Sequence, residues 1–357
     1  MIKILIVDDS KTETLLLKSI FEAEEDMQVI GCAANGKEAV RLTALLKPDL
    51  ITMDLVMPLL DGFEATRLIM SSHPTPIIII SSRLDDSALN ASFKALAAGA
   101  LCLIEKPDQA NTSFLTLKKR ITETVRSMAE IKVIKRRFQA PSKTKKNLSL
   151  PVHPELKAEP FEIIAIGSSV GGPQALKTIF SNLAADFPVP IVVVQHMTQG
   201  FIQGFTQWLN KHVRPRVKEA ENLELLVPGT IYFAPDKYHL EVIRKHGALY
   251  AKLTHGLPVS GFYPSATVLL KSVAKVSANH AIGILLTGMG SDGALGLLDM
   301  KNAQAYTFTQ DEQSAVVFGM AGVAHSLGAT NRMIELDKIA EHLISIIQKQ
   351  AAAAKID

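Results

Sequence analysis

Short runs of β-branched residues alternate with longer amphipathic segments through the first third of the chain, and this alternation restricts the fold more than any other feature. Five runs, over residues 2–7, 28–32, 50–53, 76–80 and 101–104, have the length and composition of buried strands. A segment with apolar residues at helical spacing follows each run, over residues 12–23, 37–46, 63–70, 86–98 and from about 112. Strands joined by right-handed helical crossovers form a parallel sheet that is covered on both faces. The sequence therefore predicts an α/β domain with five parallel strands.

A second alternation of strand and helix patterns begins after Phe161. Strands are predicted over residues 163–166, 191–195 and 281–286, and helices over residues 173–183, 201–212 and 266–276. A β-rich stretch over residues 231–253 lies between them and predicts a β-hairpin insertion. Since 357 residues exceed what one core commonly fills, we expect a second, doubly wound α/β domain.

Residues 131–160 differ in composition from both predicted domains. Lysine, arginine and proline dominate this stretch, and few large apolar residues follow Phe138. Such a segment buries too little surface to order itself, so we interpret it as a linker. The predicted organisation is one domain over residues 1–125, a basic linker over residues 126–160 and a second domain over residues 161–350. A basic run is more often a solvated tether than a binding patch, and the net charge is only +3, so no nucleic-acid partner is predicted.

The sequence predicts neither export nor a membrane span. The apolar stretch at the N-terminus is too short for a signal peptide and runs directly into Asp8 and Asp9. No run approaches the roughly 18–20 apolar residues that a membrane-spanning helix needs. The two cysteines, Cys32 and Cys102, lie in apolar runs and are expected to be reduced core residues. We therefore expect a cytoplasmic protein without membrane insertion, disulfide framework or zinc site.

Charged and hydroxyl residues follow the predicted strands of the first domain. Asp8 and Asp9 follow the first strand and Asp54 the third, while Ser81 follows the fourth and Lys106 the fifth. The carboxyl ends of parallel strands meet at one edge of a sheet, so these residues can form one site. Carboxylate oxygens suit Mg²⁺, and a hydroxyl and an ammonium group can hold phosphoryl oxygens. Each residue alone fits a helix cap, but their occurrence at successive strand ends favours a phosphoryl-binding site.

This pattern resembles the response-regulator receiver domain over about residues 1–125. The resemblance implies a flavodoxin-like fold in which Asp54 is the phosphoacceptor. It implies that Asp8, Asp9 and Asp54 bind Mg²⁺, the cofactor of receiver phosphorylation. It also implies that Ser81 is the switch hydroxyl and that Lys106 senses the phosphoryl group. A histidine kinase is the implied phosphodonor.

The second domain has a G-x-S-x-G motif at residues 167–171, directly after a predicted buried strand and before a predicted helix. Ser169 is its central serine. In such a motif a sharp strand-to-helix turn exposes the serine and brings its hydroxyl close to N–H groups at the helix start. A glycine turn that holds a phosphate, or an ordinary turn, fits the same residues. The motif alone therefore does not decide the function.

Two further strand ends in this domain carry the residue types that a serine hydrolase needs. His196 follows the strand that ends at residue 195, and Asp292 lies in the glycine-rich segment after the strand over residues 281–286. A histidine can take the serine proton, and a carboxylate orients the histidine and stabilises the imidazolium. Separately, His196 fits an ordinary strand-end residue and Asp292 a helix N-cap. Together with Ser169 they predict a Ser-His-Asp triad, and backbone N–H groups near Met289 and Gly290 can approach an oxyanion.

The second domain resembles the catalytic domain of protein-glutamate methylesterases from about residue 161 to residue 347. The resemblance is carried by IGSSVGG at 166–172, QHM at 195–197, AP at 234–235, HL at 239–240, LTGMGSDG at 286–293, QDE at 310–312 and FGM at 318–320. It implies Ser169 as nucleophile, His196 as general base and Asp292 as the orienting acid. It also implies that the substrates are glutamyl methyl esters on chemoreceptors, hydrolysed without a cofactor and with release of methanol, and that receptor glutamines are deamidated.

Two parts of the sequence depart from the usual pattern of these families. Leu103 stands where many receivers carry an aromatic residue that changes rotamer on activation. Tyr263, Ala266 and Thr267 stand where the methylesterase family commonly has arginine, valine and aspartate around a Pro-Ser pair. The triad residues themselves match the family pattern.

Three other functions fit the sequence less well. A non-catalytic response regulator would use the second domain only as a binding platform. A transcription factor would need a helix-turn-helix pattern, which the strand-rich second domain does not contain. In a dinucleotide-dependent enzyme, Gly171 and Gly172 would belong to a G-x-G-x-x-G motif that the sequence does not complete. The sequence therefore favours a serine hydrolase controlled by receiver phosphorylation.

Overall fold

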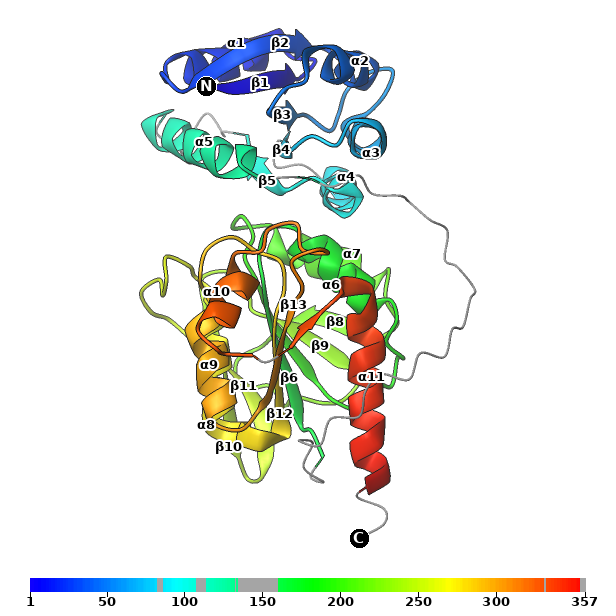
Figure 1. Cartoon of the computed structure of the whole chain (residues 1–357), viewed down its shortest axis with the longest axis vertical. Helices are drawn as coiled ribbons and strands as arrows, with labels where there is room; N and C mark the ends of the chain where they lie inside the picture. Colours follow the sequence, from blue (N-terminus) through cyan, green and yellow to red (C-terminus); the bar gives the residue numbers. More distant parts are fainter. Residues whose placement is uncertain (82–85, 107–113, 132, 134–159, 331, 354–357) are drawn as a thin grey trace.

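The computed structural model describes the chain except for residues 82–85, 107–113, 132, 134–159, 331 and 354–357. It has two α/β domains arranged along the long axis of the molecule (Figure 1). Most of the predicted linker, over residues 134–159, lies outside the described residues. The last helix of the N-terminal domain extends to Ala129, beyond the predicted domain end at residue 125. No helix in the described part of the chain is long and apolar enough to cross a membrane.

The N-terminal domain is a parallel sheet with strand order β2-β1-β3-β4-β5. Its strands are β1 (Ile2–Val7), β2 (Met27–Ala33), β3 (Leu50–Met53), β4 (Ile77–Ser81) and β5 (Cys102–Glu105). Its helices are α1 (Lys11–Glu22), α2 (Gly36–Leu46), α3 (Gly62–Ser72), α4 (Asp86–Ala98) and α5 (Phe114–Ala129). Apolar side chains of α1 and α5 pack on one face of the sheet, and those of α2, α3 and α4 pack on the other. The predicted five-stranded flavodoxin-like fold is confirmed, and the strand bounds agree to within one residue.

Polar caps determine where the first three helices begin. Ser10, Asn35 and Asp61 are the N-caps of α1, α2 and α3, and each side chain accepts a hydrogen bond from the backbone N–H three residues later. A glutamate occupies that later position in each helix, where its negative charge stabilises the positive end of the helix dipole. The caps of α1 and α3 thereby place both helix starts close to the strand ends that carry Asp8 and Asp54.

The C-terminal domain is built on a seven-stranded sheet with order β14-β13-β12-β6-β7-β9-β8, in which every neighbouring pair is parallel. Its strands are β6 (Ile163–Ser168), β7 (Ile191–Gln195), β8 (Arg216–Glu219), β9 (Thr230–Phe233), β12 (Ala281–Leu285), β13 (Tyr306–Gln310) and β14 (Met333–Ile334). An antiparallel hairpin of β10 (His239–Lys245) and β11 (Ala248–Thr254) lies outside this sheet. The predicted doubly wound domain with a hairpin insertion is confirmed.

Helices cover both faces of the seven-stranded sheet. On one face lie α6 (Gly172–Phe180), α7 (Ile202–Asn210) and α11 (Leu336–Ala353), and on the other lie α8 (Ala266–Ser277), α9 (Ala294–Asn302) and α10 (Met320–Ser326) (Figure 1). The chain winds outward from β6 in both directions, with β7 on one side of it and β12 on the other. At such a reversal the loops that follow the strands separate and leave room for a site. The predicted triad segments follow these three strands.

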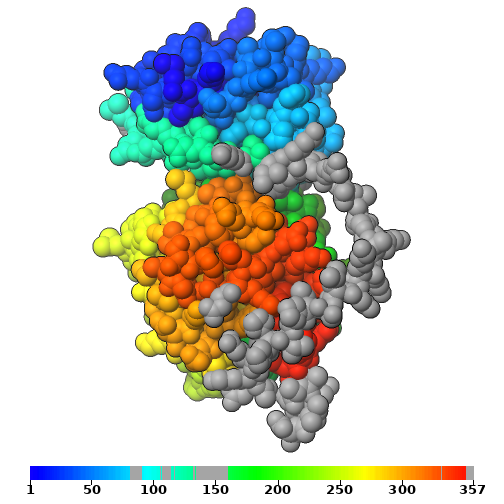
Figure 2. Space-filling model, in the orientation of Figure 1, coloured from blue at the N-terminus to red at the C-terminus, as the bar shows by residue number. Residues whose placement is uncertain are grey.

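An aromatic contact joins the two domains. The ring of Phe93 on α4 lies 5.6 Å from the ring of Phe205 and 6.0 Å from that of Trp208, both on α7, measured between centroids. All three side chains are buried, so the core beneath α2, α3 and α4 continues into the core beneath α6, α7 and α11. The Thr198 hydroxyl also donates a hydrogen bond to the Leu103 carbonyl of β5 at 2.6 Å. Figure 2 shows the two domains in direct contact.

The prediction that both cysteines are reduced core residues was only partly right: both are free, but Cys32 is not in the core and Cys102 only packs against it. Cys32 is exposed and Cys102 is partly exposed, and both are free thiols. Cys32 lies on β2 and Cys102 on β5, which form the two edges of the N-terminal sheet. An apolar run predicts burial on both faces of a central strand, but an edge strand is covered less completely.

Trp208 is the single tryptophan of the chain, so its fluorescence reports on the domain contact. We expect Phe93→Ala to shift the emission maximum to longer wavelength, because loss of the phenyl ring leaves a gap beside the indole that water can enter. The matched control is Phe21→Ala, which removes an equally buried ring from the opposite face of the same sheet. An unchanged spectrum in folded Phe93→Ala would contradict the described packing.

Candidate active site and acidic cluster

Three adjacent strands bring the predicted triad segments together. Ser169 follows β6, His196 follows β7, and Asp292 lies in the loop between β12 and α9. Because β6 pairs with both β7 and β12, the three carboxyl ends are neighbours. The Ser169 N–H donates to the Thr287 carbonyl at 3.0 Å, beyond the end of β12. The His196 N–H donates to the Ser168 carbonyl at 2.9 Å, so the strand pairing continues into the site.

Gln195 connects two of these strand ends, a role that the sequence analysis missed. Its Oε1 accepts a hydrogen bond from the Ser168 hydroxyl at 2.6 Å. Its Nε2 donates to the carbonyls of Ser169 and His196, both at 2.8 Å. A Cβ added to Gly172 would lie 2.0 Å from Oε1, so this close approach requires glycine. The buried amide thus ties the serine turn to the histidine.

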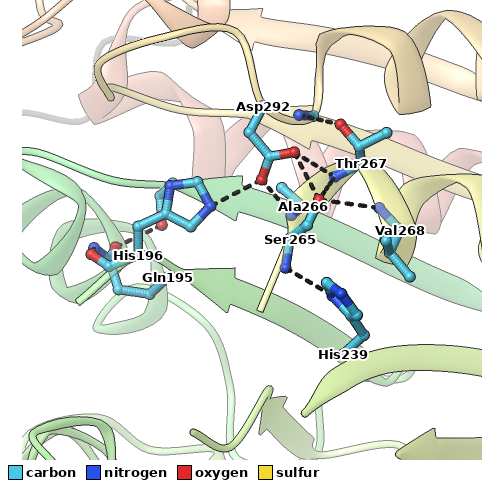
Figure 3. Close-up of polar contacts among 10 residues, drawn as sticks. Gln195, His196, His239, Ser265, Ala266, Thr267, Val268 and Asp292 are labelled. Carbon is cyan, nitrogen blue, oxygen red and sulfur yellow. Dashed lines mark hydrogen bonds and ion pairs between the residues drawn. The ribbon is translucent and has the colours of Figure 1, made fainter. Parts of the chain in front are cut away.

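The Asp292 carboxylate is fully buried and accepts four hydrogen bonds (Figure 3). Its Oδ2 accepts from His196 Nε2 at 2.9 Å and from the Ala266 N–H at 2.6 Å. Its Oδ1 accepts from the Ser265 hydroxyl at 2.7 Å and from the Thr267 N–H at 3.1 Å. Ser265 is the N-cap of α8, so the carboxylate lies against the positive end of that helix.

These hydrogen bonds keep Asp292 ionised in spite of its burial. Burial alone would raise the pKa of this carboxyl group. The contacts with His196, Ser265 and Thr267 outweigh that effect and lower the pKa from 3.8 to about 2. Since an ionised carboxylate can only accept hydrogen bonds, His196 Nε2 is the protonated nitrogen in this contact.

The other ring nitrogen of His196 is unpaired. Among the described residues, no partner is within hydrogen-bond reach of the buried Nδ1. The ring is held on one side by Asp292 and is stacked on the ring of Phe262, with 3.8 Å between centroids and an angle of 4°. Ser169 and His196 line the same cavity. In its neutral form this imidazole has a free lone pair at Nδ1, and such a group beside a serine has the chemistry of a general base.

The glycine-rich loop after β12 lies against Ser169. A Cβ added to Gly288 would lie 2.8 Å from the Ser169 Cβ, so glycine alone permits this approach. Gly290 has a φ of +83°, a conformation that favours glycine. Met289 lies between these glycines, and its side chain is partly exposed. The predicted oxyanion residues Met289 and Gly290 are therefore in a loop next to the serine.

A cavity of about 430 Å³ lies between the two domains and contains the serine and the histidine. The C-terminal domain contributes Ser169, His196 and Phe262 to its lining. The N-terminal domain lines the other side with residues of β5 and α5, among them Leu103 and Arg120. The N-terminal domain therefore covers the candidate active site.

The predicted strand-end residues of the N-terminal domain also form a cluster. Carboxylate oxygens of Asp8, Asp9 and Asp54 lie within 4.8 Å of one another. Lys106 Nζ donates to Asp8 Oδ2 and to Asp54 Oδ2, both at 3.0 Å. Glu13, which the sequence analysis missed, forms a further ion pair with Lys106 at 2.8 Å. An acidic residue in the first turn of a helix is common, so Glu13 had no distinguishing signal.

Burial and charge shift two pKa values in this cluster. Burial raises the pKa of the Asp54 carboxyl above its ordinary value, although Lys106 opposes this effect. Burial alone would lower the pKa of Lys106, but Glu13 and Asp54 raise it, so the group stays an ammonium ion. In the part of the chain that the structure describes, the Lys106 ammonium group pairs with three carboxylates at once, and hard oxygen ligands of this kind suit Mg²⁺. Ser81 ends β4, but its side chain lies outside the described residues.

Two residues that depart from the family pattern, Thr267 and Tyr263, form hydrogen bonds near the site, and Thr267 contacts the Asp292 loop. The Thr267 hydroxyl oxygen accepts a hydrogen bond from the Gly293 N–H at 2.7 Å, while the Thr267 N–H contacts Asp292. The Tyr263 hydroxyl donates to the Lys237 carbonyl at 2.6 Å. The threonine therefore connects α8 to the Asp292 loop without a second carboxylate.

Comparison with known proteins identifies the family. Residues 4–117 match the family model of the response regulator receiver domain, and residues 164–343 match that of CheB methylesterase. The chain belongs to the CheB methylesterase family. It is 40% identical over 353 residues to protein-glutamate methylesterase/protein-glutamine glutaminase 4 of Geobacter metallireducens, which covers 98% of this chain and 100% of that protein. A methylesterase/glutaminase of Syntrophus aciditrophicus is 40% identical over 354 residues, or 97% of this chain and 98% of that one.

A solved structure also resembles the C-terminal domain of this family member. The crystal structure of the CheB methylesterase catalytic domain of Thermotoga maritima matches with a TM-score of 0.51 and 35% sequence identity. The match covers 52% of this chain and 98% of the Thermotoga domain. Both family resemblances that the sequence analysis predicted are therefore confirmed.

The depressed pKa of Asp292 predicts a specific loss of stability in acid. Because the folded pKa of about 2 lies below the ordinary 3.8, the contribution to the free energy of unfolding is complete above that ordinary value and is lost as the pH falls toward 2. Between the ordinary pKa and pH 2, the free energy of unfolding of Asp292→Asn should therefore fall by about 2 kcal/mol less than that of wild type. Chemical denaturation at a series of pH values measures both. Asp186→Asn, an exposed change in the same domain, is the control. If the free energy of unfolding of Asp292→Asn and of wild type changed equally with pH, the hydrogen bonds described for the Asp292 carboxylate would be contradicted.

Proposed function

We propose that this chain is a phosphorylation-controlled serine hydrolase that demethylates glutamyl methyl esters of chemoreceptors and releases methanol. The observation that carries the proposal is the unpaired Nδ1 of His196, whose ring is held by Asp292 in the cavity that contains Ser169. Relatives at 40% identity over nearly the whole chain are named protein-glutamate methylesterase/protein-glutamine glutaminase. The site chemistry and the family thus agree.

In the proposed reaction Ser169 is the nucleophile and His196 the general base. The Ser169 Oγ attacks the γ-carbonyl carbon of the glutamyl methyl ester, and its proton passes to His196 Nδ1. The ionised Asp292 stabilises the imidazolium that forms, through the hydrogen bond at Nε2. Since α8 and Ser265 already hold this carboxylate in place, little reorganisation is needed when the charge develops.

The second half of the reaction returns the enzyme to its starting state. Backbone N–H groups of Met289 and Gly290 stabilise the tetrahedral oxyanion. The imidazolium of His196 gives its proton to the leaving methoxide, and the ester bond to methanol breaks. Water then attacks the acyl-enzyme with His196 again as base, which frees the Ser169 hydroxyl and a glutamate product. These groups and water complete the hydrolysis without a cofactor.

The same attack on a glutamine side chain would release ammonia in place of methanol. The tetrahedral intermediate is analogous, and His196 would protonate the leaving nitrogen. The names of the relatives include protein-glutamine glutaminase. We therefore extend the proposal to deamidation of receptor glutamines.

In the receiver, Asp54 is the proposed phosphoacceptor, and a histidine kinase is the proposed donor. The oxygens of Asp8, Asp9 and Asp54 would hold Mg²⁺, and their mutual distance of at most 4.8 Å supports this assignment. Mg²⁺ would offset the charge of the phosphoryl group during transfer. Lys106, which contacts Asp54, would pair with the phosphoryl oxygens, and Ser81 is the proposed switch hydroxyl.

Control of the hydrolase follows from the position of the receiver. The receiver covers the cavity that contains Ser169 and His196, and we assign this arrangement to the unphosphorylated state. Phosphorylation of Asp54 adds negative charge beside Lys106, directly after β5, and the Leu103 carbonyl of β5 bonds to Thr198 near His196. We propose that this change weakens the domain contact and admits a receptor helix. The kinase and the receptor segments are cytoplasmic partners, so the proposed location is the cytoplasm, with no nucleic-acid partner or membrane insertion.

Methanol release from methylated chemoreceptor membranes tests both domains together. Wild type should release methanol faster with a small-molecule phosphodonor and Mg²⁺ than without them. Ser169→Ala should lose about 10³-fold or more of the rate, because it removes the nucleophile. Asp54→Asn should keep the basal rate and lose the response to phosphodonor.

The alternative outcomes of this experiment are informative. Equal release by wild type and Ser169→Ala would exclude Ser169 as the nucleophile. No release by the phosphorylated wild type would favour a non-catalytic binding platform or a different substrate. A phosphodonor response in Asp54→Asn would place the phosphoacceptor elsewhere.

The acidic cluster predicts stabilisation of the receiver by Mg²⁺. A ligand that binds only the folded state raises the thermal unfolding midpoint, so excess Mg²⁺ should raise it for wild type. Asp9→Asn should reduce this rise, because it removes one of the three clustered carboxylates. The control is Asp49→Asn. Asp49 lies directly before β3, at the end of the sheet opposite the acidic cluster. An equal rise in wild type and Asp9→Asn by differential scanning calorimetry would contradict the site.

A further inference from the structure

The covered active site retains space for a small molecule. The cavity between the domains has a volume of about 430 Å³. Protein sites for small molecules have volumes of ~300–1,000 Å³. One turn of an α-helix, 5.4 Å long and ~10 Å across with its side chains, already fills about 420 Å³. A helical protein substrate continues beyond that turn in both directions, whereas a short ester does not.

The catalytic groups are already arranged in this covered state. His196 Nε2 is bonded to Asp292, Nδ1 is unpaired, and Ser169 lines the same cavity. Gln195 and α8 hold these groups from within the C-terminal domain. The hydrogen bond between His196 and Asp292 is present while the receiver covers the site. The receiver therefore restricts access to a site in which the catalytic groups are already in place.

The receiver also adds a charge to this cavity. Arg120 on α5 is the single formally charged side chain among the described residues that line it. The rest of the lining is apolar or neutral and polar, with Leu103 and Phe262 among the apolar members. A cation at the wall of a partly enclosed site attracts an anionic ligand more strongly than a neutral one of similar size. Lys119, the preceding residue on the same helix, does not line this cavity.

We propose that the unphosphorylated, closed enzyme contains a composite site, formed by both domains, that accepts small esters, preferably anionic ones, and excludes helical protein substrates. The inference rests on the proposed function, because it uses the same nucleophile. Receiver control then selects substrates by size. Phosphorylation governs access of the protein substrate, has little influence on the hydrolysis of a small neutral ester, and removes only the Arg120 contribution for an anionic one.

Para-nitrophenyl esters are suitable probes for the closed state. The Ser169 Oγ forms a bond to the ester carbonyl carbon, its proton passes to His196 Nδ1, and the bond from that carbon to the para-nitrophenolate oxygen breaks. The imidazolium then releases this proton to the para-nitrophenolate or to solvent. Water hydrolyses the acyl-enzyme with the freed His196 Nδ1 as base, and the free acid leaves. The hemiglutarate ester is anionic and the valerate ester is neutral, and the two acyl chains are similar in length.

The experiment measures kcat/KM for both esters with full-length protein, with and without phosphodonor and Mg²⁺. We expect turnover of both esters by the unphosphorylated wild type and loss of that turnover in Ser169→Ala. Phosphorylation should leave the valerate value nearly unchanged and lower the hemiglutarate value by no more than the roughly three- to fivefold that Arg120 contributes. Arg120→Gln should lower kcat/KM for the hemiglutarate about three- to fivefold and leave the valerate unchanged. Lys119→Gln, the matched loss of one positive charge from α5, should leave both values unchanged.

Each other result overturns a stated part of the proposal. Ser169-dependent ester turnover that requires phosphodonor would show that the closed state excludes small molecules as well. Equal losses for both esters in Arg120→Gln, or the same loss in Lys119→Gln, would overturn the charge preference. No ester turnover in either state, with normal methanol release from receptors, would refute the composite site and leave the proposed function intact. Ester turnover without methanol release would instead refute the proposed receptor substrate.

Discussion

The buried carboxylate of Asp292 is the group on which the rest of the candidate active site depends. A charge with no solvent exposure is strongly destabilising unless hydrogen bonds replace water. The N-terminus of α8, with the Ser265 hydroxyl, and His196 at the end of β7 supply those bonds. Because each donor needs the carboxylate in one position, α8, the β12–α9 loop and β7 are held together. The same requirement sets which nitrogen of His196 carries the proton.

The contact between the domains combines buried apolar side chains with the hydrogen bond between Thr198 and Leu103. Phe93 inserts beside Phe205 and Trp208, which accounts for the attachment of the receiver through α4. The Thr198–Leu103 hydrogen bond connects the loop after His196 with β5, which leads to Lys106. This is a spatial connection between the proposed phosphorylation site and the candidate active site, and the Asp54→Asn experiment measures whether it carries energetic coupling.

Much of the fold and most of the site residues were predictable from local patterns. The strands of the receiver were predicted to within one residue because buried parallel strands are short, apolar and separated by clear helical periods. Residues placed directly after strands, such as Asp54 and His196, were predictable because parallel topology brings strand ends together. Gln195, Phe262 and Glu13 were not predicted in their roles, since an amide, an aromatic ring and a helix-start glutamate are common in sites and cores alike. β8 was also missed, since Arg216–Glu219 carries little of the apolar signal of a strand.

The sequence by itself determined the two α/β domains, the family, and the residue types at each strand end, because all of these follow from short-range patterns along the chain. Only the tertiary structure decided that Asp292 bonds to Nε2 of His196, so that Nδ1 is left without a described partner, and that Phe262 stacks on the His196 ring. It also decided that the receiver covers the serine and brings Arg120 into the cavity. The physical reason is that these contacts join residues that are far apart in the sequence, and their distances are set by the packing of helices on sheets and of one domain on the other.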